Sequence, residues 1–231
     1  MAAPETAIIE GLASVHYAEK CVQAMREAVG PNIDIMVDAH ARHSPRMAIQ
    51  FAKALEPYGL YWYEEPCWPE NIDNIAAVQK AVSTPIATGE RLITQFAFRE
   101  LLEKHAASII QPDIIHTGGL SQARKIAAMA EAYQVAIAPH NPQGPVSTAA
   151  SIEVGFATQN YLICEAVHQD VPWRDDIVNW GFTIEAKGRL VYPNNRPGLG
   201  LEINEKELAK HPFQQEILQR SFTKDGAVTD W

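Results

Sequence analysis

The chain has 231 residues, of which 47% are hydrophobic and 20% charged, so it can bury a core and does not have the composition of a disordered chain. Nineteen basic and 28 acidic residues give a net charge of −9 without a basic cluster, which disfavours nucleic acid and anionic membrane surfaces as partners. No apolar run predicts a membrane span or signal peptide, and three scattered cysteines without a CxxC motif disfavour disulfides and cysteine–zinc sites, so we expect a cytoplasmic protein.

Short apolar segments typical of strands alternate with amphipathic segments typical of helices. The predicted strands are residues 33–37, 60–63, 85–88, 108–111, 135–138 and 161–164. Their first residues follow one another at nearly constant intervals, and the predicted helices are residues 16–29, 47–55, 96–104 and 121–133. A strand–helix unit that repeats so regularly predicts right-handed crossovers and a parallel sheet.

Polar residues follow every predicted strand, and this decides between two architectures. An open doubly wound sheet binds ligands mainly at its switch point, whereas a barrel brings all of its strand ends to one mouth. We therefore predict an α/β fold of the (β/α)8 barrel type. It is incomplete, because about six units are visible and the first predicted helix has no strand before it.

The repeating pattern stops after the sixth strand. Turn residues at 194–198, a hairpin around Gly188 and a short helix at 212–220 are predicted there. We interpret residues 1–170 as a partial barrel and residues 171–231 as a C-terminal tail packed on it.

Three carboxylates, Asp38, Glu64 and Glu90, follow one another at equal intervals along the chain, and the interval matches the strand–helix repeat. Each therefore ends one of three consecutive strands and faces the same mouth. Three such acids repel one another unless a cation lies between them, and an all-oxygen donor set favours Mg²⁺ over Zn²⁺. Glu65 points away from Glu64 by strand alternation and is expected to form a structural ion pair.

Asp113 and His140 are again one strand–helix unit apart. An Asp on the neighbouring strand end would orient the imidazole and raise its basicity, so His140 is a candidate base. Glu165, one further unit along the chain, is a candidate to hydrogen-bond a substrate oxygen or a developing oxyanion.

The other histidines divide into candidates and structural residues. His40 shares a face with Asp38 and could act from the side opposite His140, and His116 could line the mouth. His43, His105 and His211 are interpreted as structural or surface residues. The pair Gly118-Gly119 is weak support for a phosphate loop.

Six motifs in this order resemble the enolase superfamily, and most closely its mandelate racemase subgroup and the acid-sugar (galactonate-type) dehydratases. They are Asp-x-His, Tyr-Glu-Glu-Pro, Thr-Gly-Glu, Gln-Pro-Asp with a following His-x-Gly-Gly, Ala-Pro-His-x-Pro-x-Gly-Pro, and a strand-end Glu. The resemblance covers about residues 15–205. It implies that the chain is N-terminally truncated, without the capping α+β domain and the first two barrel strands.

The resemblance also implies roles for the candidate residues. Mg²⁺ would be bound by the three spaced carboxylates, His140 with Asp113 would remove a proton α to a carboxylate, and His40 would protonate the leaving β-hydroxyl. Glu165 would bind the substrate carboxylate. Ala41 departs from the family pattern, in which Gly often follows the Asp-x-His motif.

These residues predict a Mg²⁺-dependent dehydratase that converts a sugar acid such as galactonate to a 2-keto-3-deoxy acid. We expect a small-molecule substrate, a homo-oligomer and low activity of this chain by itself. Two alternatives stay open. One is a racemase or epimerase of an α-hydroxy acid, and the other is a catalytically silent homologue.

Overall fold

The computed structural model describes residues 11–167, 170–180, 183–184, 190–191, 197–215, 221–222, 226 and 228–229. Its largest sheet has five parallel strands in the order β1-β2-β3-β4-β5. The strands are β1 (Ile35–Asp38), β2 (Leu60–Glu64), β3 (Ile86–Thr88), β4 (Ile109–Ile110) and β5 (Ala136–Ile137). Sequence order equals spatial order, as it does in a (β/α) barrel.

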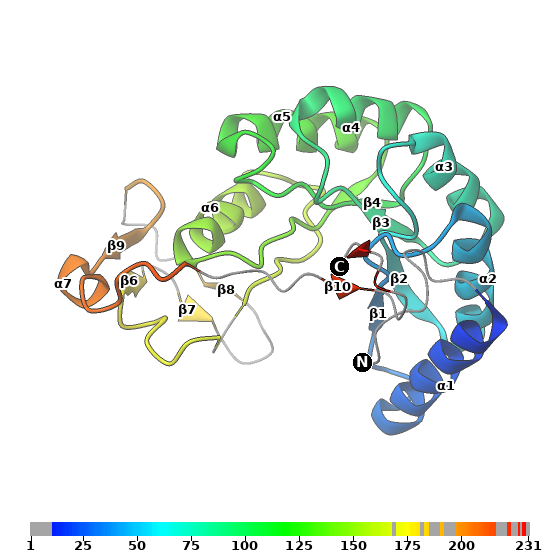
Figure 1. The fold of residues 1–231 in the computed structure, drawn as a ribbon. Helices are drawn as coiled ribbons and strands as arrows, with labels where there is room; N and C mark the ends of the chain where they lie inside the picture. The colour runs from blue at the N-terminus through cyan, green and yellow to red at the C-terminus, as the bar shows by residue number, and fades with distance from the viewer. Residues whose placement is uncertain are drawn as a thin grey trace.

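Helices follow the strands as an open arc round the outside of the sheet (Figure 1). They are α1 (Leu12–Val29), α2 (Pro45–Leu55), the 3-10 helix η1 (Glu56–Tyr58), α3 (Ile72–Ala81), α4 (Thr94–Glu103), α5 (Gly119–Ala132) and α6 (Pro145–Phe156). None of the helices in the described part of the chain combines the length and the apolar character needed to span a membrane. The described residues form an incomplete barrel and contain no capping α+β domain.

Local sequence explains where α2 begins and which face it buries. The Ser44 hydroxyl accepts a hydrogen bond from the amide of Met47, and Pro45 occupies the first turn, both typical of a helix N-terminus. The buried residues of α2 recur at helical spacing along one face: Met47, Ala48, Phe51, Ala52 and Leu55. This stripe joins the main core between helices and sheet, and a smaller cluster around Trp62, Ala87, Ile109 and Ala138 fills the inner side of the strands.

The predicted sixth strand is reduced to a single bridge. Tyr161 pairs with Ile137, and the amide of Leu162 donates to the Ile137 carbonyl over 2.8 Å, but residues 162–167 form no strand. This bridge is enough to bring the following Glu165 to the same end of the sheet as the other strand ends.

Beyond α6 the chain forms small antiparallel pairs. These are β6 (Val178–Trp180) with β9 (Leu201–Ile203), β7 (Thr183–Ile184) with β8 (Leu190–Val191), and β10 (Ser221–Phe222) with β11 (Val228–Thr229). The β7–β8 pair is the predicted hairpin; its turn, including Gly188, lies outside the described residues, as do residues 194–196 of the predicted turn. Trp180, Leu199 and Leu201 pack against Ala149 and Ile152 of α6.

The predicted helix at 212–220 is wrong for residues 212–215, which are not helical, and the rest of that segment lies outside the described residues. The short helix is instead α7 (Glu205–Leu208), where the side chain of Asn204 accepts a hydrogen bond from the amide of Glu207. Phe213 is 91% exposed, so the apolar residues of 212–215 have no surface to pack on, and local spacing alone does not stabilise a helix.

Candidate active site

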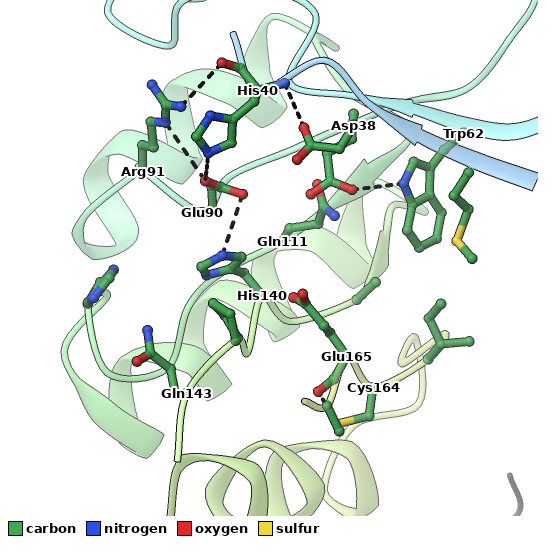
Figure 2. Close-up of a pocket in the computed structure, with 17 residues that line it drawn as sticks. Asp38, His40, Trp62, Glu90, Arg91, Gln111, His140, Gln143, Cys164 and Glu165 are labelled. Carbon is green, nitrogen blue, oxygen red and sulfur yellow. Dashed lines mark hydrogen bonds and ion pairs between the residues drawn. The ribbon is translucent and has the colours of Figure 1, made fainter. Parts of the chain in front are cut away.

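A cavity of about 1080 Å³ opens at the carboxyl ends of the strands (Figure 2). Seven of the eight predicted site residues line it: Asp38, His40, Glu64, Glu90, His116, His140 and Glu165. The eighth, Asp113, is fully buried and contacts His140 directly. The structure therefore brings all eight together, as parallel strand ends require.

Backbone constraints at the strand ends place these side chains. Gly89, just before Glu90, has φ +140°, and a Cβ there would lie 2.9 Å from the Phe98 ring and 3.0 Å from the Gln111 amide. Any larger residue would push the Glu90 turn away from β4. Glycine is thus a steric requirement of the Thr-Gly-Glu motif.

The pair formed by His140 and Asp113 has the geometry of an oriented base. The His140 Nδ1 lies 2.9 Å from the Asp113 Oδ2, while the Asp113 Oδ1 accepts from the amides of Ile115 and His116. Burial alone would raise the pKa of Asp113, but hydrogen bonds from His140, the His116 amide and Gln143 outweigh it and lower that pKa to about 2. The ionised carboxylate accepts hydrogen bonds only, so Nδ1 carries a proton and Nε2 faces the cavity.

Charges around His140 strengthen it as a base. Burial by itself would lower the pKa of His140, but the hydrogen bond to Asp113 and the negative charges of Glu90 and Glu165 raise it overall. The His140 side chain is 17% exposed, so its ring reaches the cavity while most of it stays packed. A raised pKa makes the imidazole a better proton acceptor, as a general base requires.

A second histidine faces the same cavity from the first strand end. The His40 Nε2 is 3.7 Å from one Glu90 oxygen, and the His140 Nε2 is 3.6 Å from the other, so Glu90 lies between the two rings (Figure 2). His40 has φ +49°, and its amide donates to the Asp38 Oδ1 over 2.7 Å. The next residue, Ala41, has φ +57°, a conformation that glycine adopts without steric cost.

Glu64, one of the three predicted metal ligands, is partly buried and held by two hydrogen bonds. The indole nitrogen of Trp62 donates to its Oε2 over 3.0 Å, and Gln111 also hydrogen-bonds to it. Burial raises the pKa of Glu64 to about 7 against these two bonds, and the charges of Asp38 and Glu90 add to the rise. The local field therefore disfavours a third negative charge, which a cation would reverse.

The donor chemistry of Asp38, Glu64 and Glu90 fits a hard divalent cation, because all three offer carboxylate oxygens at adjacent strand ends of one cavity. Their present orientation does not form a coordination sphere: among the described residues, no three His, Cys, Asp or Glu side chains are arranged to hold one ion. The Glu90 oxygens instead face the two histidines. Metal binding by these residues stays a prediction.

Glu65 forms the predicted ion pair. Its side chain is fully buried, and the Arg91 Nε lies 3.0 Å from its Oε2 and 3.8 Å from the Glu90 Oε1. Burial raises the pKa of Glu65 to about 8, the charge of Glu90 adds to this, and the Arg91 cation opposes it. The Arg91 Nη2 also donates to the His40 carbonyl over 3.4 Å, so this arginine joins the ends of three strands.

Glu165 and His116 lie at the rim of the cavity. The Glu165 Oε2 accepts from the Asn141 amide over 2.8 Å, and the Asn141 side chain donates to the Glu165 carbonyl over 2.9 Å. His116 is half exposed, with its Nδ1 3.8 Å from the Asp113 Oδ2. Both lie within reach of a ligand, and neither is held as firmly as His140.

The three histidines interpreted as structural lie apart from the cavity lining. His43 is buried, stacks on Phe51 and contacts the Tyr63 hydroxyl through Nδ1 at 2.8 Å. His105 lies against the Tyr133 ring, and His211 stacks on Trp173.

Sequence reasoning missed four polar lining or supporting residues: Trp62, Arg91, Gln111 and Gln143. All four stand next to, or inside, a recognised motif: Trp62 directly precedes Tyr-Glu-Glu-Pro, Arg91 follows Glu90, Gln111 begins Gln-Pro-Asp and Gln143 lies within the His140 motif. Adjacency to a strand-end motif is therefore the signal that could have found them.

Parallel strands whose titratable ends meet at one cavity define the class of (β/α) barrel proteins with a site at the carboxyl ends of the strands. Residues 6–207 match the family model described as enolase C-terminal domain-like, and the chain belongs to this family. Its incomplete barrel is the corresponding part of that domain.

Individual relatives agree with this assignment. The chain is 36% identical to a D-galactonate dehydratase of Pectobacterium atrosepticum over 98% of its length and 61% of the relative's, and 33% identical to a D-galactonate dehydratase family member of Streptomyces bingchenggensis over 100% and 56%. A mandelate racemase/muconate lactonizing enzyme from Sulfitobacter matches all of this chain and 57% of its own, with 35% identity and a TM-score of 0.86. The chain thus spans less than two thirds of the length of these relatives.

Proposed function

We propose that this chain carries the catalytic residues of a Mg²⁺-dependent hydro-lyase that removes water from a sugar acid such as galactonate. One observation carries the proposal: His140, oriented by the buried and ionised Asp113, faces a cavity that it shares with His40 and three carboxylates. The similarity to the D-galactonate dehydratase of Pectobacterium supports the substrate class.

In the proposed reaction the His140 Nε2 accepts the proton from the carbon α to the substrate carboxylate. The electron pair of that C–H bond forms the enediolate, and Mg²⁺ held by Asp38, Glu64 and Glu90 would supply the positive charge that stabilises it. His40 donates a proton to the β-hydroxyl as its C–O bond breaks, so water leaves and an enol is formed. The enol then tautomerises to the 2-keto-3-deoxy acid.

The residues around the two histidines support this division of work. The Asp113 carboxylate fixes the His140 ring and stabilises the imidazolium formed when it takes the proton. Glu165 lies at the cavity rim, where it can hydrogen-bond a substrate oxygen. The Arg91 hydrogen bond to the His40 carbonyl holds the turn on which His40 stands.

The test is incubation of the purified chain with Mg²⁺ and D-galactonate in deuterated buffer, followed by NMR at high protein concentration. The proposal expects deuterium at the α-carbon and a 2-keto-3-deoxy product. Exchange with epimerisation but no loss of water would identify a racemase or epimerase. Neither exchange nor product, in the presence of bound Mg²⁺, would contradict the proposal for this chain and favour the catalytically silent homologue.

The metal part is tested separately by calorimetric titration with Mg²⁺. Glu64 has a pKa of about 7 and binds a cation only when ionised. Mg²⁺ affinity should therefore rise by up to about tenfold per pH unit from pH 6 to 7 and level off towards pH 8. Glu64→Gln should weaken binding and remove this pH dependence, whereas Glu70→Gln, an exposed position on the loop before α3, should do neither. Equal Mg²⁺ binding by wild type and Glu64→Gln would contradict the metal assignment.

A further inference from the structure

A hydrogen bond outside the proposed proton transfers fixes one more side chain at the cavity wall. Gln143 follows His140 by three residues, lines the cavity and donates from its Nε2 to the Asp113 Oδ2 over 3.1 Å. That carboxylate oxygen is the one that also contacts the His140 Nδ1. Asp113 therefore touches the base and Gln143 through the same atom.

The ionisation of Asp113 determines which way the Gln143 amide is turned. A carboxylate accepts hydrogen bonds and cannot donate one, so the amide nitrogen of Gln143 must face Asp113 and the amide oxygen must face away from it. A flipped amide would place two acceptors against each other. The Gln143 Oε1 is thus presented as an acceptor in a fixed orientation.

The backbone of Gln143 is held independently from the C-terminal part of the chain. Arg174 is 9% exposed, its Nη1 donates to the Gln143 carbonyl over 3.2 Å, and its guanidinium pairs with the Asp170 carboxylate. Both the backbone and the side chain of Gln143 are therefore anchored. Such preorganisation reduces the conformational entropy that a side chain loses when it binds a ligand.

Asp113 does not need Gln143 to hold its own position, because its other oxygen already accepts from two backbone amides at 2.8 and 3.1 Å. The bond therefore orients Gln143 more than it orients Asp113. A fixed acceptor at the wall of a cavity matches a donor on the ligand, and a sugar acid offers hydroxyl groups as donors.

We infer that Gln143 is a substrate-binding and specificity-determining residue, whose amide oxygen accepts a hydrogen bond from one hydroxyl of a polyhydroxylated acid. The inference rests on the proposed function and specifies how the same cavity selects its substrate. Sites that hydrogen-bond a hydroxyl discriminate against analogues that lack it, because the polar group of the site is then left without a partner.

The experiment measures binding, so it does not depend on turnover. Dissociation constants of D-galactonate and its single-deoxy analogues are determined by ligand-observed NMR in the presence of Mg²⁺, for wild type and Gln143→Leu. For wild type, one analogue should bind about 3- to 10-fold more weakly than galactonate. Gln143→Leu should weaken the binding of galactonate by a similar factor and leave the dissociation constant of that analogue unchanged. The two ligands should then bind the variant equally.

Two further variants separate recognition from general damage. Gln134→Leu changes an exposed glutamine outside the cavity lining and should behave like wild type with every ligand. Arg174→Met releases the Gln143 backbone and the Asp170 carboxylate but leaves the Gln143 side chain in place, so it should give a smaller loss of galactonate affinity, again without a loss for the same analogue. If Gln143→Leu weakened the binding of galactonate and of all analogues equally, or weakened the binding of none of them, the proposed role of Gln143 would be overturned. If wild type bound no sugar acid, the proposed function and this inference would both fall.

Discussion

The two sides of the cavity are built differently. On one side, Asp113 is fully buried, accepts four hydrogen bonds and holds His140, whose side chain is 17% exposed. On the other side, the His40 side chain is 30% exposed and stands on a turn with positive φ. The first arrangement suits a base that must be oriented in advance, and the second suits a proton donor that adjusts to the substrate.

The charges on the two sides differ as well. Hydrogen bonds outweigh burial at Asp113 and keep its pKa near 2, whereas burial outweighs the opposing interactions at Glu64 and Glu65 and raises their pKa values to about 7 and 8. A carboxylate with a pKa as low as that of Asp113 is ionised before any ligand arrives. Glu64, which lines the cavity, becomes fully ionised at neutral pH when further positive charge is near it, and this couples that side to a cation.

Substitution of the two histidines should give the largest effects. It tests directly whether His140 is the base and His40 the proton donor. His140→Asn should reduce both α-proton exchange and dehydration by about 10²- to 10⁴-fold. His40→Asn should reduce dehydration by a similar factor while exchange continues, because the enediolate still forms and collapses back. NMR in deuterated buffer measures both rates together. Exchange that is lost in His40→Asn and retained in His140→Asn would invert the assignment.

The ion pair beneath His40 should give the largest effect on stability. Arg91→Met leaves Glu65 buried without a cation and should cost about 3 kcal/mol or more above pH 8. The pKa of Glu65 is raised above its unfolded value, so the folded state binds this proton more tightly and loses stability as the pH rises. As the pH falls through about 8, Glu65 takes up the proton, so the cost of Arg91→Met should shrink and be small at pH 6.

Urea unfolding at pH 6 and pH 9 measures this difference. Arg99→Met is the matched control, because the Arg99 Nε lies 3.7 Å from Glu103 in a pair that is more than half exposed, and such pairs contribute about 0–1 kcal/mol. A loss for Arg91→Met that is no larger than for the control at pH 9 would show that Arg91 does not neutralise Glu65.

The base side predicts the opposite pH dependence. The pKa of Asp113 is lowered from 3.8 to about 2, so its ionised form contributes stability that is present above pH 4 and is lost as the pH falls towards 2. This contribution is about 2 kcal/mol at neutral pH. Asp113→Asn should therefore lower the unfolding free energy at pH 6. At pH 2 the unfolding free energies of wild type and variant should be nearly equal.

Asp170→Asn is the control for this measurement. Its hydrogen bonds with Arg174 also lower the pKa of Asp170 to about 2, but the side chain is 38% exposed and solvent screens the pair. Its substitution should change the acid part of the stability profile much less than Asp113→Asn. Equal changes would mean that burial adds nothing to the Asp113 contribution.

The strand ends were the part of the molecule that the sequence could predict best. The equal spacing of Asp38, Glu64 and Glu90 locates all three, because each strand–helix unit returns the chain to the same mouth. The contact between Gln143 and Arg174 has no such repeat, since it joins a strand-end loop to a segment outside the pattern, 31 residues away. Only the folded chain shows which backbone carbonyl Arg174 reaches.

The smallest expected effect concerns His43, which stands three residues from His40. This test distinguishes a structural histidine, His43, from a proposed catalytic one, His40. Tyr63→Phe removes the hydroxyl that contacts the His43 Nδ1 at 2.8 Å, and both side chains are buried. The loss should be about 1 kcal/mol, because His43 keeps its stacking on Phe51 at 4.0 Å between ring centroids. Thermal or urea unfolding measures this loss, while α-proton exchange should stay within about twofold of wild type, since neither group lines the cavity. A large loss of exchange at unchanged stability would instead show that the His43 contact orients His40, and that the proton-donor side is as strictly positioned as the base side.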